Sequence, residues 1–469
     1  MITYSEKERV FKLDTANTSY IIGIVDDENF IGHVYYGKKL KDIDVTYLLK
    51  TWEYPFVPSK NNRERCSFYD LFPFEYPTGG MGDYRESCFE VKTASGHFGS
   101  MLSYVSHEII NGKPKLEGLP ATFGNEDECT TLKIVCEDKY IGMQVELLYT
   151  AFNDTDVITR SVKVINTGKE HFYLTKVFSA CLDMDRKDFD MVSLNGSWAR
   201  ERHIQRKALG YGIQKVSSFR GESSHQNHPF IALVDRNTTQ ENGEIYAMNF
   251  VYSGNFCAQA EVSQFDYVRM SMGINTQNFC WKLESGESFQ APEVVMVYTD
   301  KGFDSMTQNF HRLYKKHLIR GQYKNKKRPV LINNWEATYF DFNTKKLLSI
   351  AQEASKLGIE MLVMDDGWFG KRSFDNCALG DWKVNEEKIE GGLKNLVDEV
   401  NKLGMKFGIW FEPEMISPDS DLYRAHPDWA LAIPGRPGTE SRQQFVLDLT
   451  RKEVVDCVYE QVASILRSA

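Results

Sequence analysis

The hydrophobic pattern of this 469-residue chain changes once, and that change limits the folds the chain can adopt. Up to about residue 300, short stretches in which apolar and polar residues alternate are separated by Gly, Asn, Asp and Pro, which is typical of β-strands. After Pro329, short apolar runs alternate with segments of helical periodicity. The sequence therefore predicts two domains of different class, a large β-sandwich and a parallel α/β structure.

A helix and a basic stretch mark the boundary between these two regions. In residues 303–319, Met306, Phe310 and Leu313 lie on one face of a predicted helix, and Asp304 or Ser305 can cap its start. We interpret this helix as a linker. Basic residues 324–328 then lead to Pro329, so the sequence predicts a β-rich domain over residues 1–325 and an α/β domain over residues 326–469.

The α/β region contains fewer units than a closed barrel. Strands are predicted at residues 330–333, 361–364 and 407–411, with a short fourth at 445–449, and helices at 345–357, 393–403 and 453–466. Polar and aromatic residues follow these strands, and a (β/α)8 barrel carries its active site at the carboxyl ends of its strands. Because that barrel has eight strands, we expect residues 326–469 to form its first half and the chain to be truncated.

Composition restricts the partners. There are 56 Lys and Arg against 65 Asp and Glu, and the net charge of −9 argues against a nucleic-acid partner. The N-terminus lacks a signal sequence and no apolar stretch approaches the ~20 residues of a membrane span, so we expect a cytoplasmic protein that does not bind membranes. Nine cysteines without a C-x-x-C pair indicate reduced thiols rather than a disulfide framework or a zinc ribbon.

The strongest candidate site is Met364-Asp365-Asp366-Gly367-Trp368, at the end of the second predicted strand. If the turn aims both carboxylates into one cleft, they can accept hydrogen bonds from two hydroxyls of a sugar ring. The alternative is a loop whose aspartate caps the next helix. Five of the eight tryptophans lie in the last third of the chain, which favours the sugar site because flat apolar rings can stack on sugars.

Further candidates follow the other predicted strands. Glu412 or Glu414 could pair with Asp366 as the two carboxyl groups of a glycosidase, which lie ~5–9.5 Å apart. Sequence spacing does not measure that distance, and we interpret both glutamates as structural hydrogen-bonding residues. Trp410 is a candidate sugar-stacking wall, with a buried barrel aromatic as the alternative. The segment with His225 and His228 has metal-like spacing but lacks the helix of a zinc site, so we interpret it as a loop.

Arg442 and Trp335 each have two possible roles. Arg442 precedes the predicted strand at residues 445–449 and can either orient a carboxylate or sugar hydroxyl or be solvated at the surface. Trp335 follows the first predicted strand and can either pack in the core or line the cleft.

At these residues the sequence resembles the bacterial α-galactosidases of glycoside hydrolase family 36. The matching stretches are LNGSWARERH (194–203), SHQNHPFIAL (224–233), LINNWEATYFDF (331–342), LVMDDGWFGKR (362–372), LGDWKVN (379–385), GLKNLVDEVNKLGMKFGIWFEPEMISPDSDLYRAHPDW (392–429) and RQQFVLDLT (442–450). Several long motifs in the same order make this resemblance specific, and it extends over essentially the whole chain.

The resemblance implies an N-terminal β-supersandwich, a (β/α)8 barrel and a C-terminal β domain, of which half the barrel and the last domain are absent here. It implies retaining hydrolysis of terminal α-D-galactosyl groups in melibiose and raffinose-type oligosaccharides, by a homotetramer that needs no metal or cofactor. Asp365 and Asp366 would hold the galactose hydroxyls. The same subsite would be lined by Trp335, Trp410 and Arg442, and Trp198 would reach the sugar from the sandwich.

No catalytic residue is predicted within the chain, because the nucleophile and the acid/base of the family match positions beyond Ala469. We therefore expect these 469 residues alone to lack hydrolase activity. Two alternatives stay open: a galactosyl-transferring enzyme of similar fold, and a non-catalytic galactoside-binding fragment or scaffold. The short LGDWKVN region argues against the transferase, and the preference for galactose over N-acetylgalactosamine is a further open choice.

Overall fold

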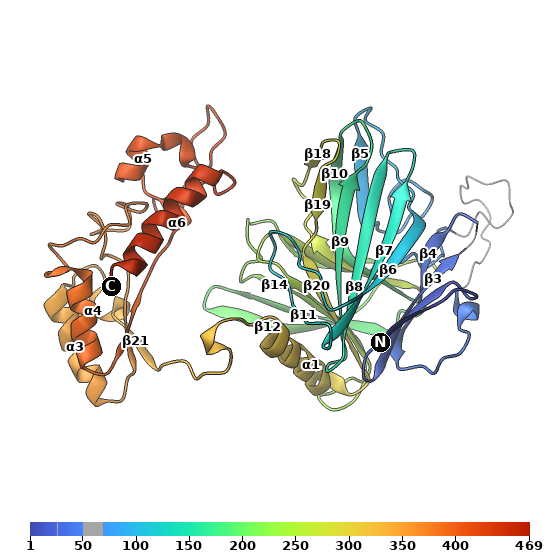
Figure 1. Ribbon diagram of the computed structural model, residues 1–469, viewed down its shortest axis with the longest axis horizontal. Coiled ribbons are helices and arrows are strands. Elements are labelled where there is room, and N and C mark those ends of the chain that lie inside the picture. Colours follow the sequence, from blue (N-terminus) through green and yellow to red (C-terminus); the bar gives the residue numbers. More distant parts are fainter. Residues whose placement is uncertain (26, 50–68) are drawn as a thin grey trace. The chain divides into compact units, whose positions relative to one another are not determined.

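The computed structural model describes residues 1–25, 27–49 and 69–469, which form two compact units, Met1–Gly321 and Gln322–Ala469 (Figure 1). Cys66 lies outside the described residues; the eight cysteines within them are free. No helix in the described part of the chain is long and apolar enough to cross a membrane.

The first unit is built from antiparallel sheets, as the alternating pattern predicts. Its strands are β1 (Ile2–Ser5), β2 (Val10–Asp14), β3 (Thr18–Val25), β4 (Phe30–Lys38), β5 (Phe89–Thr93), β6 (Ser103–Asn111), β7 (Cys129–Asp138), β8 (Met143–Phe152), β9 (Val157–Asn166), β10 (Phe172–Met184), β11 (Phe189–Ser197), β12 (Arg200–Ala208), β13 (Gly212–Ser218), β14 (Asn227–Asp235), β15 (Ile245–Val251), β16 (Phe256–Val262), β17 (Val268–Ile274), β18 (Trp281–Leu283), β19 (Ser288–Gln290) and β20 (Glu293–Thr299). A single-turn helix, η1 (Thr46–Leu48), follows β4.

These strands form three sheets within the described residues. Four strands pair in the order β1-β2-β3-β4, and six pair as β13-β16-β17-β10-β18 with β5 also paired to β10. The ten-stranded sheet has the order β12-β11-β14-β15-β20-β9-β8-β7-β6, with β19 paired to β9. Along β8 the alternate residues Met143, Val145, Leu147 and Tyr149 are buried, so period-two alternation faces the core here as expected.

Helix α1 (Gly302–His317) packs on the ten-stranded sheet through Met306, Phe310 and Leu313. It begins at Gly302, whose φ of 70° is in the left-handed region that favours glycine. A Cβ at that position would lie 2.5 Å from the Thr239 carbonyl oxygen, so only glycine fits. The expected cap at Asp304 or Ser305 is therefore wrong, because both residues lie inside the first turn and the N-cap is Lys301.

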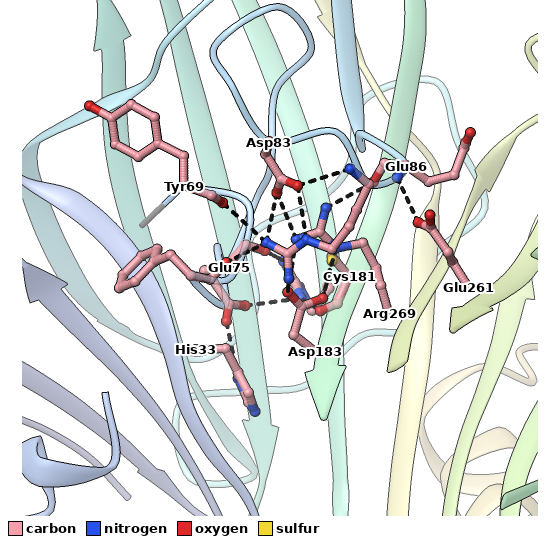
Figure 2. Close-up of polar contacts among 12 residues, drawn as sticks. His33, Tyr69, Glu75, Asp83, Glu86, Cys181, Asp183, Glu261 and Arg269 are labelled. Carbon is pink, nitrogen blue, oxygen red and sulfur yellow. Dashed lines mark hydrogen bonds and ion pairs between the residues drawn. The ribbon is translucent and has the colours of Figure 1, made fainter. Parts of the chain in front are cut away.

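A buried network of ion pairs joins the segment before β5 to the six-stranded sheet (Figure 2). Asp183 on β10 accepts hydrogen bonds from Arg269 on β17, with 2.8 Å from Nε to Oδ1 and 2.8 Å from Nη2 to Oδ2. Asp83 accepts from Arg85 Nε at 2.8 Å and lies 3.0 Å from Arg269 Nη2. All four side chains are at least nine-tenths buried, so each charge requires the others.

Glu75, in the same segment, joins the other two sheets. Its Oε1 accepts from the hydroxyls of Tyr20 on β3 (2.6 Å) and Tyr149 on β8 (2.9 Å), and lies 2.9 Å from Arg160 Nη1 on β9. Its Oε2 lies 3.2 Å from His33 Nδ1 on β4. The fully buried carboxylate thus bonds to strands of both the four-stranded and the ten-stranded sheet.

The second unit begins with βα units. Strands β21 (Leu331–Asn333), β22 (Met361–Met364) and β23 (Lys406–Ile409) pair in parallel in that order. Its helices are η3 (Gln322–Lys324), α2 (Trp335–Thr338), α3 (Thr344–Lys356), α4 (Gly392–Lys402), α5 (Asp421–Ala425), η4 (Pro427–Trp429) and α6 (Lys452–Arg467). Apolar residues of α3 and α4, including Leu347, Ala351 and Leu396, pack with Leu362 and Met364 of the central strand.

The short fourth strand predicted at residues 445–449 does not join this sheet. Phe445–Val446 (β25) instead pairs antiparallel with Met415–Ile416 (β24). The apolar residues of this region form a separate small cluster with α6, in which Ile416, Leu447 and Val454 are buried. Of the predicted strand, Leu447 is buried in that cluster and Phe445 packs against it, whereas Val446 and Leu449 are exposed.

We predict that the first unit loses stability in acid through its buried carboxylates. Burial alone would raise the pKa of Asp183, but the ion pairs with Arg269 and Arg85 outweigh it and the pKa is lowered. The stabilisation by such a group is present above the unfolded pKa, about 4, and is lost as pH falls through the folded value. At pH 7, Asp183→Asn should lower the free energy of unfolding by about 3–5 kcal/mol, because it leaves buried arginine charge uncompensated.

Urea unfolding followed by circular dichroism between pH 3 and 7 measures this effect. The difference between wild type and Asp183→Asn should shrink toward the acid end of the range. Asp188→Asn is the matched control, because its carboxylate is 72% exposed and 3.8 Å from its partner Arg236. If the stability difference between wild type and Asp183→Asn does not change with pH, protonation of Asp183 is not coupled to unfolding and the prediction is wrong.

Candidate functional site

The candidate site lies at the carboxyl ends of the three parallel strands. Asp365 directly follows β22, Asn333 ends β21, and Trp410 directly follows β23. Backbone bonds hold these ends together, because Trp410 N–H donates to the Met364 carbonyl at 3.0 Å and Asp365 N–H donates to Asn334 Oδ1 at 2.8 Å. Parallel strands place their carboxyl ends at one edge of the sheet, which is where barrel enzymes bind substrate.

Asp366 forms a buried ion pair with Arg372. The Arg372 Nε donates to Oδ1 at 3.0 Å and Nη2 donates to Oδ2 at 2.8 Å, with side-chain exposures of 0% for Arg372 and 5% for Asp366. The remaining guanidinium nitrogen, Nη1, donates to the carbonyls of Asp375 (2.7 Å) and Cys377 (2.9 Å). The orientation of the Asp366 carboxylate is therefore set by a bidentate contact that is itself anchored to the backbone.

The neighbouring Asp365 is in a different environment. It is only partly buried, its Oδ2 accepts from Asn333 Nδ2 at 2.5 Å, and its Oδ1 accepts from the Asp366 backbone N–H at 2.7 Å. A carboxylate has about four lone-pair positions, so each oxygen of Asp365 can still accept a bond from a ligand hydroxyl. The two adjacent carboxylates thus combine one rigid, buried acceptor with one accessible acceptor.

Sequence reasoning missed Arg372 and Lys388. Arg372 lies in the same loop as Asp366, and a buried carboxylate needs a nearby cation, so the Gly-Lys-Arg that follows Asp365-Asp366-Gly367 was an available signal. Lys388 Nζ donates to the carbonyls of Phe340, Gly367 and Arg372. No local pattern distinguishes it from a solvated lysine.

The two candidate tryptophans occupy different positions. Trp335 starts α2 rather than ending a strand; it is half-buried and contacts the rings of Tyr339 and Phe340 at 5.2 and 5.0 Å. Trp410 is also half-buried, and its carbonyl accepts from Trp368 Nε1 at 2.9 Å. Its ring flanks a cluster of buried aromatic residues, which includes Trp368, Phe369 and Trp382.

Arg442 is linked to Asp366 through a chain of contacts. It is exposed, has a left-handed φ of 51°, and donates from Nη2 to Asp375 Oδ1 at 2.7 Å. Asp375 in turn accepts from Arg372 through its backbone carbonyl. Arg442 thus reaches the loop that holds the candidate carboxylates instead of being simply solvated.

Glu412 faces the same charged groups. Burial raises its pKa, Arg442 and Arg372 oppose that effect, and Glu414 and Asp366 add to it. Its buried Oε2 has no hydrogen-bond partner among the described residues. We expected Glu412 to be a structural hydrogen-bonding residue, but its Oε2 makes no such bond within the described residues.

Trp198 belongs to the first unit. It lies at the turn of the β11–β12 hairpin and its side chain is 81% exposed. His225 precedes β14 and His228 lies within it. In the described ranges, no group of three or more His, Cys, Asp and Glu side chains is arranged to hold a metal ion.

The described chain is thus a large antiparallel sandwich followed by parallel βα units, with Asp365, Asp366 and Trp410 directly after the strands. Residues 29–284 match the glycosyl hydrolase family 36 N-terminal domain, and residues 288–469 match melibiase. The chain belongs to glycoside hydrolase family 36, and its α/β unit is the first part of a (β/α)8 barrel.

Individual relatives agree with this assignment. The chain is 46% identical over all its 469 residues to α-galactosidase AgaA of Geobacillus stearothermophilus, and it spans 64% of that protein's length. The crystal structure of α-galactosidase AgaB from the same organism matches with a TM-score of 0.97 at 46% identity, covering 100% of this chain and 64% of that one. A variant of AgaA in complex with raffinose matches with a TM-score of 0.96, covering 98% and 64%.

We predict that the Arg372 cation is required for the stability of the second unit. Arg372→Met leaves the buried Asp366 carboxylate without its partner, so the free energy of unfolding should fall by about 3–5 kcal/mol. Urea unfolding followed by tryptophan fluorescence measures it, because Trp368 and Trp382 are buried in this unit. Arg424→Met is the control, since that side chain is 54% exposed and surface pairs contribute about 0–1 kcal/mol. Equal losses for both variants would exclude a special role for the buried pair.

Proposed function

We propose that this chain supplies the sandwich and the sugar-holding part of a retaining α-galactosidase that acts on terminal α-D-galactosyl groups of melibiose and raffinose-type oligosaccharides. Asp365 and Asp366 accept hydrogen bonds from galactose hydroxyls, while Trp335, Trp410 and Arg442 line the same subsite. By the resemblance to the family, Trp198 is a further candidate sugar-contacting residue. The observation that carries the proposal is the Asp365–Asp366 pair at the end of β22, with Asp366 oriented by Arg372.

The geometry favours a holding role for these aspartates over a catalytic one. Covalent glycosidase catalysis needs a carboxylate that is free to attack the anomeric carbon and a second carboxyl group that protonates the leaving oxygen. Both oxygens of Asp366 already accept hydrogen bonds from Arg372. A carboxylate held in this way is suited to orienting a sugar. We therefore place the nucleophile and the acid/base outside these 469 residues. No metal or cofactor is needed for this chemistry.

The assembly and location of the protein belong to the same proposal. We place the enzyme in the cytoplasm as a homotetramer, in line with its resemblance to the bacterial family. Cross-linking and analytical ultracentrifugation of the purified protein would measure the assembly, and a monomer at micromolar concentration would contradict it.

The first test is hydrolysis of p-nitrophenyl α-galactoside by the protein with its complete barrel. Galactose release should be unchanged by EDTA, since carboxylates alone perform the chemistry. Asp365→Asn should lower kcat/KM by roughly 10- to 150-fold, corresponding to about 1.5–3 kcal/mol for hydrogen bonds to a charged acceptor. Folding should be retained, because Asp365 is only partly buried.

Asp398→Asn is the matched control for this variant, because Asp398 is half-exposed on α4 and pairs only with Lys394 in the described residues. Its kcat/KM should equal that of wild type. EDTA-sensitive activity, or full activity of Asp365→Asn, would contradict the proposed mechanism. Transfer of galactose to a second sugar faster than to water would favour the galactosyl-transferring alternative.

A second test uses the 469 residues as they stand. They should not hydrolyse p-nitrophenyl α-galactoside, because the resemblance to the family places the nucleophile and the acid/base beyond residue 469. Limited proteolysis should leave a resistant β-rich fragment that ends near residues 324–328, next to the boundary between the two units. Turnover by this chain alone would show that its own carboxylates perform the catalysis.

A further inference from the structure

Lys388 uses all the donors of its ammonium group on three backbone carbonyls. Its Nζ lies 2.9 Å from the Phe340 oxygen, 3.0 Å from the Gly367 oxygen and 3.1 Å from the Arg372 oxygen. A lysine ammonium has three N–H donors, so each one is satisfied by a carbonyl. The same nitrogen lies 5.2 Å from the centre of the Phe342 ring, a cation–π contact.

Two of the three carbonyls belong to residues that are bonded to Asp366. Gly367 is the next residue in the chain, and Arg372 is the residue whose guanidinium holds the Asp366 carboxylate. Phe340 belongs to the loop after α2, which follows β21. The Lys388 ammonium therefore connects the loops that follow two adjacent strands. In the second loop it bonds to the residue next to Asp366 and to the arginine that orients the Asp366 carboxylate.

The Lys388 ammonium is partly buried and bonds to backbone carbonyls instead of a carboxylate. Burial lowers the pKa of Lys388, an effect opposed by Asp366 and Asp341 at longer range. Within the described residues no carboxylate forms an ion pair with Lys388. The positive charge is thus held by three carbonyl dipoles and the face of the Phe342 ring, and an apolar side chain at this position would leave the three carbonyls without this donor.

The backbone of Lys388 is itself fixed, so the contact is rigid at both ends. Its N–H donates to Asn385 Oδ1 at 3.1 Å, and its carbonyl accepts from the Thr344 N–H at the start of α3 at 3.1 Å. Gly367, on the other side, has a φ of 106°, and a Cβ there would lie 3.1 Å from the Phe340 ring. Neither partner can shift without moving an anchored loop.

We propose that Lys388 is a positioning residue for sugar binding, which acts through the Asp366 loop by holding Gly367 and Arg372 in place. It touches no substrate itself. The proposal rests on the proposed function, in which Asp366 holds galactose hydroxyls. A displacement of about 1 Å in a substrate-holding group can lower the rate about 10²-fold. Loss of the Lys388 contacts should therefore lower the rate of hydrolysis.

The test is a double-mutant cycle in the enzyme with its complete barrel. Hydrolysis of p-nitrophenyl α-galactoside is measured at a temperature well below the melting temperature of every variant. Lys388→Met keeps the length of the side chain and its contact with Phe342 but removes the donors and the charge. It should lower kcat/KM at least tenfold, equivalent to about 1.4 kcal/mol. In an Asp366→Asn background the same change should alter kcat/KM less than twofold, because the group through which Lys388 acts is gone.

Two further variants complete the design. Lys394→Met removes an exposed lysine from α4 of the same unit and should leave kcat/KM unchanged. Lys388→Arg keeps the charge but replaces the compact ammonium by a planar fork, so it should retain the wild-type melting temperature and lose about threefold or more in kcat/KM. If Lys388→Met does not fold, Lys388→Arg decides, and its full activity would overturn the proposal.

The outcomes separate this inference from the proposed function. A tenfold loss in both backgrounds would assign Lys388 a general structural role and overturn positioning through Asp366. Activity of Lys388→Met equal to that of Lys394→Met would also overturn it, while leaving the α-galactosidase proposal intact. A wild-type enzyme without α-galactosidase activity would overturn both.

Discussion

A carboxylate taken out of water must be paired, and both units of this protein are organised around that constraint. In the sandwich, Asp183 is held by Arg269, and in the α/β unit Asp366 is held by Arg372; each carboxylate is almost fully buried. Replacing such pairs by apolar residues is often neutral for stability. Their effect is on geometry, because a bidentate contact fixes how the two side chains, and the segments that carry them, are oriented.

In the sandwich this constraint joins the sheets. Residues 69–88, the described part of the segment before β5, form no helix or sheet strand, yet Glu75 connects them to the four- and ten-stranded sheets, and Asp83 connects them to the six-stranded sheet. In the α/β unit the same constraint orients one of the candidate sugar-binding carboxylates. Arg372 turns the Asp366 carboxylate into a fixed acceptor, and Lys388 secures the loop around it with three carbonyl contacts. The accessible acceptor, Asp365, lies beside this rigid pair.

Local periodicity predicted most elements but not their partners. The strand expected at residues 361–364 is β22, and the helices expected at 345–357 and 453–466 correspond to α3 and α6, because side-chain alternation reports burial directly. The strand expected at 445–449 was wrong, since its apolar residues pack with α6 and β24 instead of the parallel sheet. A short apolar run does not show which neighbour the segment packs against, and here Val446 and Leu449 are exposed.

By itself the sequence determined the order of the two units, their class, the family and the position of Asp365 and Asp366 at a strand end. Those features depend on residues within a few positions of one another or on motif order. Only the tertiary structure decided that Asp366 is buried against Arg372, that Arg442 reaches the same loop through Asp375, and that Lys388 holds it. These contacts join loops whose paths are set by the packing of whole strands and helices, so spacing along the chain does not encode them.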